Sequence, residues 1–134
     1  IREYANYLKI GHKLIQLDQL FASIFSTRED VHMLINCFDA VLHPSQTEGF
    51  GLEVLEAMAH GRMVLCSTGA GAVDCVPADW SFPAGNSDVL AASIDSIKKE
   101  GKWQEQAGRC VERAKCYQWE DIRQKYVDLW KGLN

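Results

Sequence analysis

The sequence predicts an α/β domain built on a doubly wound parallel sheet. Its 134 residues suit one domain. A composition that is 47% hydrophobic and 24% charged is typical of a globular chain and excludes a disordered or low-complexity one. Short apolar runs alternate with longer stretches of helical periodicity, which is the pattern of β-α-β units. We treat residues 1–134 as one domain, and we expect both its start and a second domain to lie outside this sequence.

The first third of the chain is expected to alternate helices and short strands. Thr27 begins T-R-E-D, close to a capping box, and apolar residues follow at helical spacing. The apolar run D-A-V-L-H indicates a buried strand because Pro44 stops it directly afterwards. The expected elements are a helix over 1–10, a strand over 13–17, a helix from Thr27 to Phe38 and a strand over 39–43.

The remainder follows the same alternation and then becomes helical. Gly61 ends the helix that follows the loop over 44–50, and a glycine-rich turn follows the next strand. The expected elements are a helix over 51–60, a strand over 63–66, a turn over 67–71, one helical turn over 72–76, a strand over 80–82, and helices over 87–100, 102–117 and 119–131. About four strands is few for a doubly wound sheet. Right-handed crossovers place the loops that follow the strands at one edge, where ligands bind.

Charge and composition exclude several classes of function. Residues 1–97 carry 5 Lys/Arg against 12 Asp/Glu, whereas residues 98–134 carry 9 against 6. Neither part has the basic, aromatic-rich stripe of a nucleic-acid-binding protein. The five cysteines form no C-x-x-C pair, so we expect reduced thiols and no metal site. No apolar run reaches the length of a membrane span. The chain is expected to be soluble and cytoplasmic, with peripheral attachment to a membrane through segments outside this sequence as the alternative.

The loop P-S-Q-T-E-G-F-G, over residues 44–51, has the features of an anion-binding turn. Its glycines allow a close backbone approach, and the amides near Leu52 and Glu53 open the following helix with a partial positive charge. Glu48 precedes these amides and Glu56 follows them, and carboxylates bind sugar hydroxyls strongly. The same features also fit a simple turn, with Phe50 as a core residue and a solvated helix face. Spacing alone does not decide between the two.

Residues 41–76 resemble the donor-binding signature of retaining GT-B glycosyltransferases, in particular glycosyltransferase family 4. That signature runs P-S-x-x-E-G-F-G, a second glutamate after seven residues, A-M-A-x-G, a strand and a glycine-rich turn with an acidic residue. Met63, Ala70 and Asp74 depart from it. The resemblance implies a partial C-terminal, Rossmann-like domain of a GT-B fold with C-terminal helices. It implies that Glu48 is catalytic at the transferred sugar, and that the donor is bound by Gly49, Phe50, Gly51, Leu52, Glu53 and Glu56.

The resemblance further implies a parent enzyme that transfers a glycosyl group, with retention, from a nucleotide diphosphate sugar to an acceptor in glycan or glycoconjugate synthesis. No cofactor and no metal are expected. The isolated chain should be inactive, and it should dock on an N-terminal domain of the same protein or on a partner chain. A non-catalytic nucleotide-sugar module and a vestigial structural domain stay open as alternatives. Trp119, Tyr126 and Trp130 are expected to pack within this domain, with docking on the missing one as the alternative.

Overall fold

The computed structural model describes residues 2–9, 27–101 and 103–133. The chain divides into two units, Ile1–Leu34 and Ile35–Asn134. The first unit contains helix α1 (Arg2–Tyr7) and most of helix α3 (Arg28–Ile35). At the start of α3, the Asp30 carboxylate accepts from the Thr27 amide at 2.9 Å and the Thr27 hydroxyl accepts from the Asp30 amide at 3.2 Å. This reciprocal pair confirms the predicted capping box.

The second unit is built on a three-stranded parallel sheet in the order β1-β2-β3. Strand β1 (Ala40–His43) pairs with β2 (Met63–Ser67), and β2 pairs with the short β3 (Ser81–Phe82). All five residues of β2 are buried, as expected of the central strand of a covered parallel sheet. The α/β class and the parallel sheet are therefore confirmed. The predicted strand over 13–17 lies outside the described residues.

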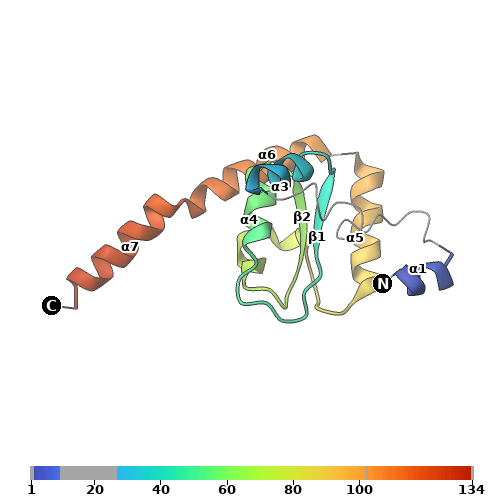
Figure 1. Ribbon diagram of the computed structural model, residues 1–134, viewed down its shortest axis with the longest axis horizontal. Helices are drawn as coiled ribbons and strands as arrows, with labels where there is room; N and C mark the ends of the chain where they lie inside the picture. The colour runs from blue at the N-terminus through green and yellow to red at the C-terminus, as the bar shows by residue number, and fades with distance from the viewer. Residues whose placement is uncertain (1, 10–26, 102, 134) are drawn as a thin grey trace. The chain divides into compact units, whose positions relative to one another are not determined.

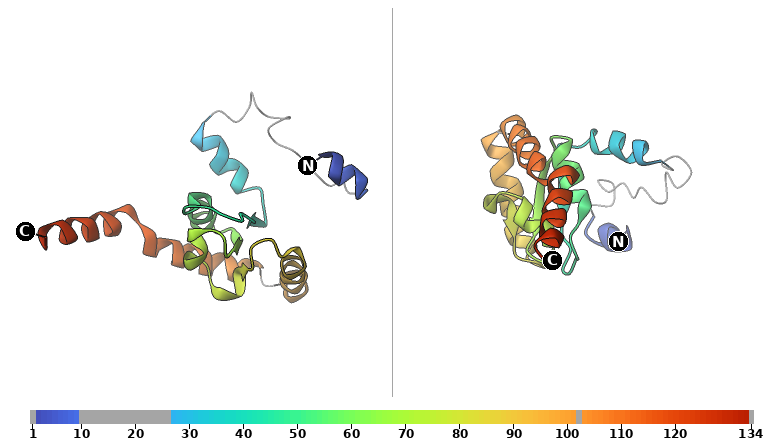
Figure 2. Two further views of the ribbon diagram at one scale, coloured as in Figure 1. Left: turned by 90° about the horizontal axis from the view of Figure 1, so that it is seen from below. Right: turned by 90° about the vertical axis from the view of Figure 1, so that its left-hand side faces the viewer.

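Helices cover the sheet, and their bounds lie close to the predicted ones. Figure 1 shows α4 on one side of β1 and β2 and α5 on the other, and Figure 2 gives two further views of the ribbon. Val54, Ala57 and Met58 of α4 are buried against the strands, and the Leu90, Ile94 and Ile97 stripe of α5 packs on the same core. The remaining elements are α4 (Leu52–Ala59), the 3-10 turns η2 (Gly71–Cys75) and η3 (Ala78–Trp80), α5 (Ser87–Glu100), α6 (Trp103–Ala114), η4 (Lys115–Tyr117) and α7 (Trp119–Lys131).

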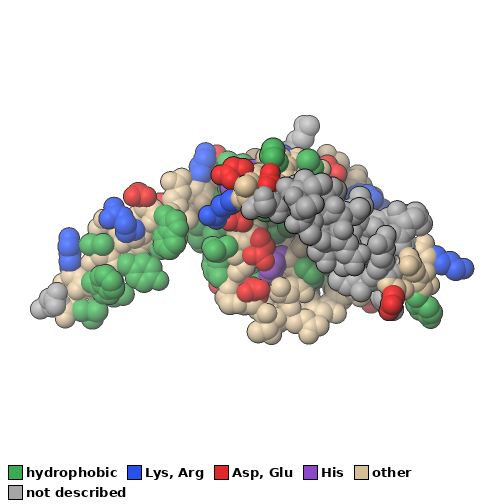
Figure 3. Space-filling model, in the orientation of Figure 1, with side chains coloured by type: hydrophobic (Ala, Val, Ile, Leu, Met, Phe, Trp, Pro, Cys, Tyr) green, Lys and Arg blue, Asp and Glu red, His purple; other side chains and the backbone are tan. Residues whose placement is uncertain are grey.

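Helix α7 corrects one expectation. Its aromatic residues were expected to pack within this domain, but Trp119, Tyr126 and Trp130 are exposed by 77%, 59% and 69%. No residue of α7 is buried, and hydrophobic side chains gather along this helix in Figure 3. The stripe that the sequence predicts is present, because Tyr126, Leu129 and Trp130 recur at helical spacing. Packing of the stripe within this domain is therefore wrong, and docking on another domain stays open as the alternative.

All five cysteines are free, and three of them, Cys66, Cys75 and Cys110, are buried. Burial raises the pKa of the Cys66 and Cys110 thiols from the usual 9.0 to about 11. The unfolded chain releases these protons near pH 9 and the folded chain near pH 11. Stability that is fully present below pH 9 is therefore lost as the pH rises toward 11.

We expect the free energy of unfolding to fall between pH 9 and pH 11, and to fall less steeply in Cys110→Ala because that variant has one buried thiol fewer. Urea unfolding at pH 8, 9, 10 and 11 measures how steeply the free energy of unfolding falls in the parent chain and in Cys110→Ala. Other groups that titrate in this range affect both proteins equally. Cys116→Ala is the matched control, since it removes an exposed thiol in place of a buried one. Equal slopes for Cys110→Ala and the parent chain would contradict the expectation.

Candidate functional site

The loop that follows β1 is held in place by the loop that follows β2. Glu48 forms an isolated parallel bridge with Ala70, and the Glu48 amide donates to the Gly69 carbonyl at 3.0 Å. The Ala72 amide donates to the Phe50 carbonyl at 2.7 Å, and the Ser67 hydroxyl donates to the Ser45 carbonyl. Because β1 and β2 are parallel neighbours, both loops leave the sheet at its carboxyl edge. The predicted site therefore lies where the fold places ligands.

Two glycines allow this close approach. A Cβ on Gly69 would lie 2.3 Å from the Gln46 carbonyl oxygen, and one on Gly71 would lie 2.4 Å from the Gly49 carbonyl oxygen. Both obstacles are backbone atoms, so neither can rotate away. The turn over residues 69–71 is therefore compact, even with alanine at position 70, where this chain departs from the family signature. Ala70 itself is buried, at 2% exposure.

Helix α6 anchors the far end of this second loop. Arg113 donates from Nη2 to the Asp74 carbonyl at 3.0 Å and from Nε to the Cys75 carbonyl. The Tyr117 hydroxyl also reaches the Asp74 carbonyl, at 3.4 Å. These contacts fix η2, whose first residue, Gly71, lies against the loop over 44–51. A helix remote in sequence thus helps to position the predicted donor loop.

The N-terminus of α4 is built as the sequence analysis predicts. Gly51 is the N-cap, with φ 94°, a left-handed conformation that favours glycine. No side chain of the described residues caps the helix, and the Gly51 carbonyl accepts from Val54 at 3.1 Å. The first-turn amides of Leu52 and Glu53 therefore have no side-chain cap, and the helix dipole gives them a partial positive charge.

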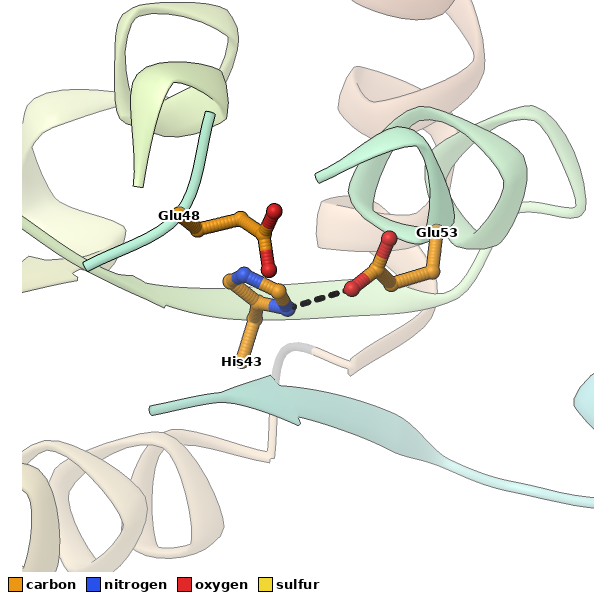
Figure 4. Close-up of side chains that lie close together, drawn as sticks. All are labelled: His43, Glu48 and Glu53. Atoms are coloured by element: carbon orange, nitrogen blue, oxygen red, sulfur yellow. Dashed lines mark ion pairs between the residues drawn. The ribbon is translucent and has the colours of Figure 1, made fainter. Parts of the chain in front are cut away.

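Two of the three predicted glutamates lie together. One oxygen of Glu48, one oxygen of Glu53 and one nitrogen of His43 all lie within 4.8 Å of one another. Figure 4 shows the His43 ring close to both carboxylates. His43 Nδ1 lies 3.1 Å from Glu53 Oε1, and Glu48 Oε1 accepts from the Gly49 amide at 3.1 Å. Within the part of the chain that the structure describes, this is the group of side chains with a donor set suited to a divalent cation.

The other predicted residues take different places. Glu56 is half-buried one turn further along α4 and is not part of this cluster. Phe50 is 40% exposed, so the alternative that it is a core residue is wrong. Leu52 is exposed as well, which leaves the helix start accessible.

Sequence reasoning missed His43 as a site residue. It ends β1, and it is buried at 5% exposure, beside the carboxylates of Glu48 and Glu53. The available indication was a polar residue at the end of an otherwise apolar strand, at the edge where ligands bind. The sequence analysis counted it only as part of the strand.

The fold and the site define a class: an α/β domain whose parallel sheet presents a glycine-rich loop, a glutamate and an open helix start at its carboxyl edge. The chain belongs to the glycosyl transferases group 1 family, whose model matches residues 3–116. Its relatives include the O-antigen chain mannosyltransferase B of Escherichia coli, 32% identical over 108 residues, which make up 78% of this chain and 28% of that protein. An uncharacterized glycosyltransferase of Methanocaldococcus jannaschii is 28% identical over 133 residues, 92% of this chain and 32% of that protein.

These figures limit what the family assignment covers. The chain spans about a third or less of the length of either relative. The activity, substrates and partners of the whole protein are therefore matters of proposal. None of the helices in the described ranges 2–9, 27–101 and 103–133 combines the length and hydrophobicity of a membrane span.

Proposed function

We propose that this chain is the donor-binding part of a retaining glycosyltransferase that acts in glycan or glycoconjugate synthesis. The observation that carries the proposal is the open start of α4, with Glu48 directly beside it at the carboxyl edge of the sheet. Backbone amides at a helix start bind phosphates, and a carboxylate binds sugar hydroxyls. In a nucleotide diphosphate sugar, the sugar is attached directly to the diphosphate, so one molecule offers both kinds of group side by side. Membership in a glycosyltransferase family supports the same ligand.

Each part of the donor has a place in this arrangement. The amides of Leu52 and Glu53 face the diphosphate, and the backbone of Gly49, Phe50 and Gly51 lies beside the sugar. Glu56, about 4.5 Å beyond Glu53 along the helix axis at about 1.5 Å per residue, bonds the ribose hydroxyls. Glu48 is the catalytic residue. Departure of the diphosphate leaves positive charge on the sugar, which the Glu48 carboxylate stabilises.

The donor sugar is a hexose in this proposal. One relative is named as a mannosyltransferase, so a mannose donor is the first to test. The leaving diphosphate is stabilised by fixed amides and basic groups, and the reaction uses no cofactor and no metal. The His43, Glu48 and Glu53 donor set makes this last point worth testing directly.

The isolated chain should bind the donor weakly. Residues 1–97 carry 5 Lys/Arg against 12 Asp/Glu, and a helix N-terminus offsets this repulsion by only about 0.3–1 kcal/mol. We propose that an N-terminal domain of the same protein, or a partner chain, supplies basic groups and the acceptor site. The exposed aromatic stripe of α7 supports such docking, because a contiguous apolar face is typical of an interface. The five free cysteines are compatible with a cytoplasmic location, which is part of the proposal.

Calorimetric titration of the complete protein with UDP- and GDP-sugars, followed by transfer assays, tests the proposal. We expect micromolar binding of one nucleotide sugar, transfer with retention by NMR of the product anomer, and unchanged rates in EDTA. Binding without transfer in the complete protein would indicate a non-catalytic module instead. The absence of any binding would indicate a vestigial domain, and loss of activity in EDTA, with recovery on adding Mn²⁺, would overturn the metal-free mechanism.

A further inference from the structure

His43 is a polar side chain enclosed in the core at the edge where the donor is proposed to bind. Its side chain is 7% exposed, and its Nδ1 lies 3.1 Å from the Glu53 carboxylate. Its other nitrogen, Nε2, is buried and has no hydrogen-bond partner among the described residues. A buried nitrogen without a partner costs about 1–3 kcal/mol, so a fold that retains one at this place calls for an explanation.

The contact with Glu53 determines which nitrogen of the His43 ring carries the proton and which remains available for another partner. A carboxylate only accepts hydrogen bonds, so the Nδ1 atom carries the proton of this contact. Burial and the Glu53 contact together hold the ring in one orientation. Nε2 is therefore the nitrogen left available, and its direction is set by the protein.

Nε2 is directed to the place where Gly51 and Glu48 meet. A Cβ on Gly51 would lie 3.1 Å from His43 Nε2 and 3.7 Å from Glu48 Cγ. The missing side chain of Gly51 thus leaves room on the side that both groups share. Figure 4 shows the second ring nitrogen on the side of Glu48, with Glu53 at the first.

We propose that His43 is a positioning residue that orients the Glu48 carboxylate through Nε2, while Glu53 holds the ring through Nδ1. This inference rests on the proposed function, in which Glu48 faces the donor sugar. With a proton already on Nδ1, this bond needs a second proton on the ring, so that Nε2 donates to the carboxylate and Glu48 keeps its charge. It also needs a small rotation of Glu48 away from the Gly49 amide. The bond satisfies the buried nitrogen and fixes the carboxylate in one rotamer, which preorganises it for the reaction.

Two substitutions separate the roles of the two nitrogens. The side-chain amide of asparagine reaches the position of Nδ1, whereas that of glutamine reaches the position of Nε2. In the complete enzyme, we expect His43→Asn to lower kcat by about 10- to 100-fold with donor affinity little changed, because a carboxylate misplaced by about 1 Å can lose that much rate. We expect His43→Gln to recover most of the activity. His60→Asn and His60→Gln, at the other end of α4, are matched controls with unchanged kcat.

A role that is only structural gives the opposite result. If His43 merely holds α4 through Glu53, His43→Asn keeps its activity and His43→Gln loses it together with thermal stability, which overturns the inference. The Glu48→Gln background adds a second criterion. A residue that acts through Glu48 has no further effect on kcat there, whereas an independent effect of His43→Asn overturns the proposal.

One measurement leaves His43 in place, in case its variants do not fold. We expect the ¹⁵N chemical shift of Nε2 to change in Glu48→Gln while that of Nδ1 stays as it is, and an unchanged Nε2 shift overturns the inference. The proposed function fails in a distinguishable way, since a wild-type enzyme that transfers no sugar fails before any His43 variant is compared. An active enzyme in which both His43 variants match the wild type refutes the positioning role alone.

Discussion

Replacing Glu48 by glutamine should lower the kcat of the complete enzyme by about 100-fold or more, with donor affinity nearly unchanged. The amide keeps the shape of the side chain, and its carbonyl can still accept from the Gly49 amide as Glu48 Oε1 does at 3.1 Å. What is lost is the negative charge that, in the proposed mechanism, stabilises positive charge on the sugar as the diphosphate leaves. Removal of one preorganised electrostatic group of this kind typically costs about 100- to 1000-fold in kcat. Steady-state kinetics and donor titration on the same preparation separate the two effects.

Glu56→Ala should show the complementary result. In the proposed arrangement, its carboxylate contacts the ribose in the ground state and the transition state alike, so its loss weakens donor binding by about 1.5–3 kcal/mol and leaves kcat nearly unchanged. Glu105→Gln on the exposed side of α6 removes the same charge away from the site and serves as the control. Identical kinetics for the parent enzyme, Glu48→Gln and Glu56→Ala would refute this division of roles.

Local periodicity accounts for most of what the sequence predicts about the fold. The limits of α5 and α7 agree with the expected ones because each helix has its own apolar stripe and its own start and end residues. Strands β1 and β2 follow from short apolar runs ended by Pro44 and by the glycine-rich turn. The same local patterns place Glu48 in a loop and Glu53 and Glu56 on a helix.

Contacts between distant segments are what the sequence does not predict. The need for glycine at 69 and 71 comes from carbonyls more than twenty residues earlier. Nothing within the run D-A-V-L-H shows that its histidine meets Glu53 and lies beside Glu48, since this depends on how β1 sits under the start of α4. The direction of the α7 stripe is open for the same reason, because periodicity defines an apolar face and not its partner.

Of the glycines that the structure describes, Gly69 has the least room for a side chain, so Gly69→Ala should have the largest structural effect among the changes of these glycines to alanine. Its Cβ would lie 2.3 Å from the Gln46 carbonyl oxygen and 2.6 Å from that of Ser45, and both are backbone atoms. The loops over 44–51 and 67–72 must therefore separate. Separation breaks the bond from the Glu48 amide to the Gly69 carbonyl, which is 3.0 Å long, and moves the carboxylate that we propose to be catalytic. We expect a loss of about 1–3 kcal/mol in the free energy of unfolding and at least tenfold weaker donor binding.

Two further glycines show whether the cause is this contact rather than the loss of a glycine. A Cβ on Gly49, in the same pair of loops, meets nothing within 4 Å, so Gly49→Ala should leave the free energy of unfolding nearly unchanged. Gly108 is interior to α6 and equally open, and Gly108→Ala should stabilise the chain by about 0.5–1 kcal/mol without changing donor affinity. Urea unfolding of the three variants, with donor titration of Gly69→Ala and Gly108→Ala, makes the comparison. The idea that close contact between the two loops positions Glu48 is wrong if Gly69→Ala has the free energy of unfolding of Gly49→Ala and the donor affinity of Gly108→Ala. Those results would mean that a methyl group fits between the two loops without moving them.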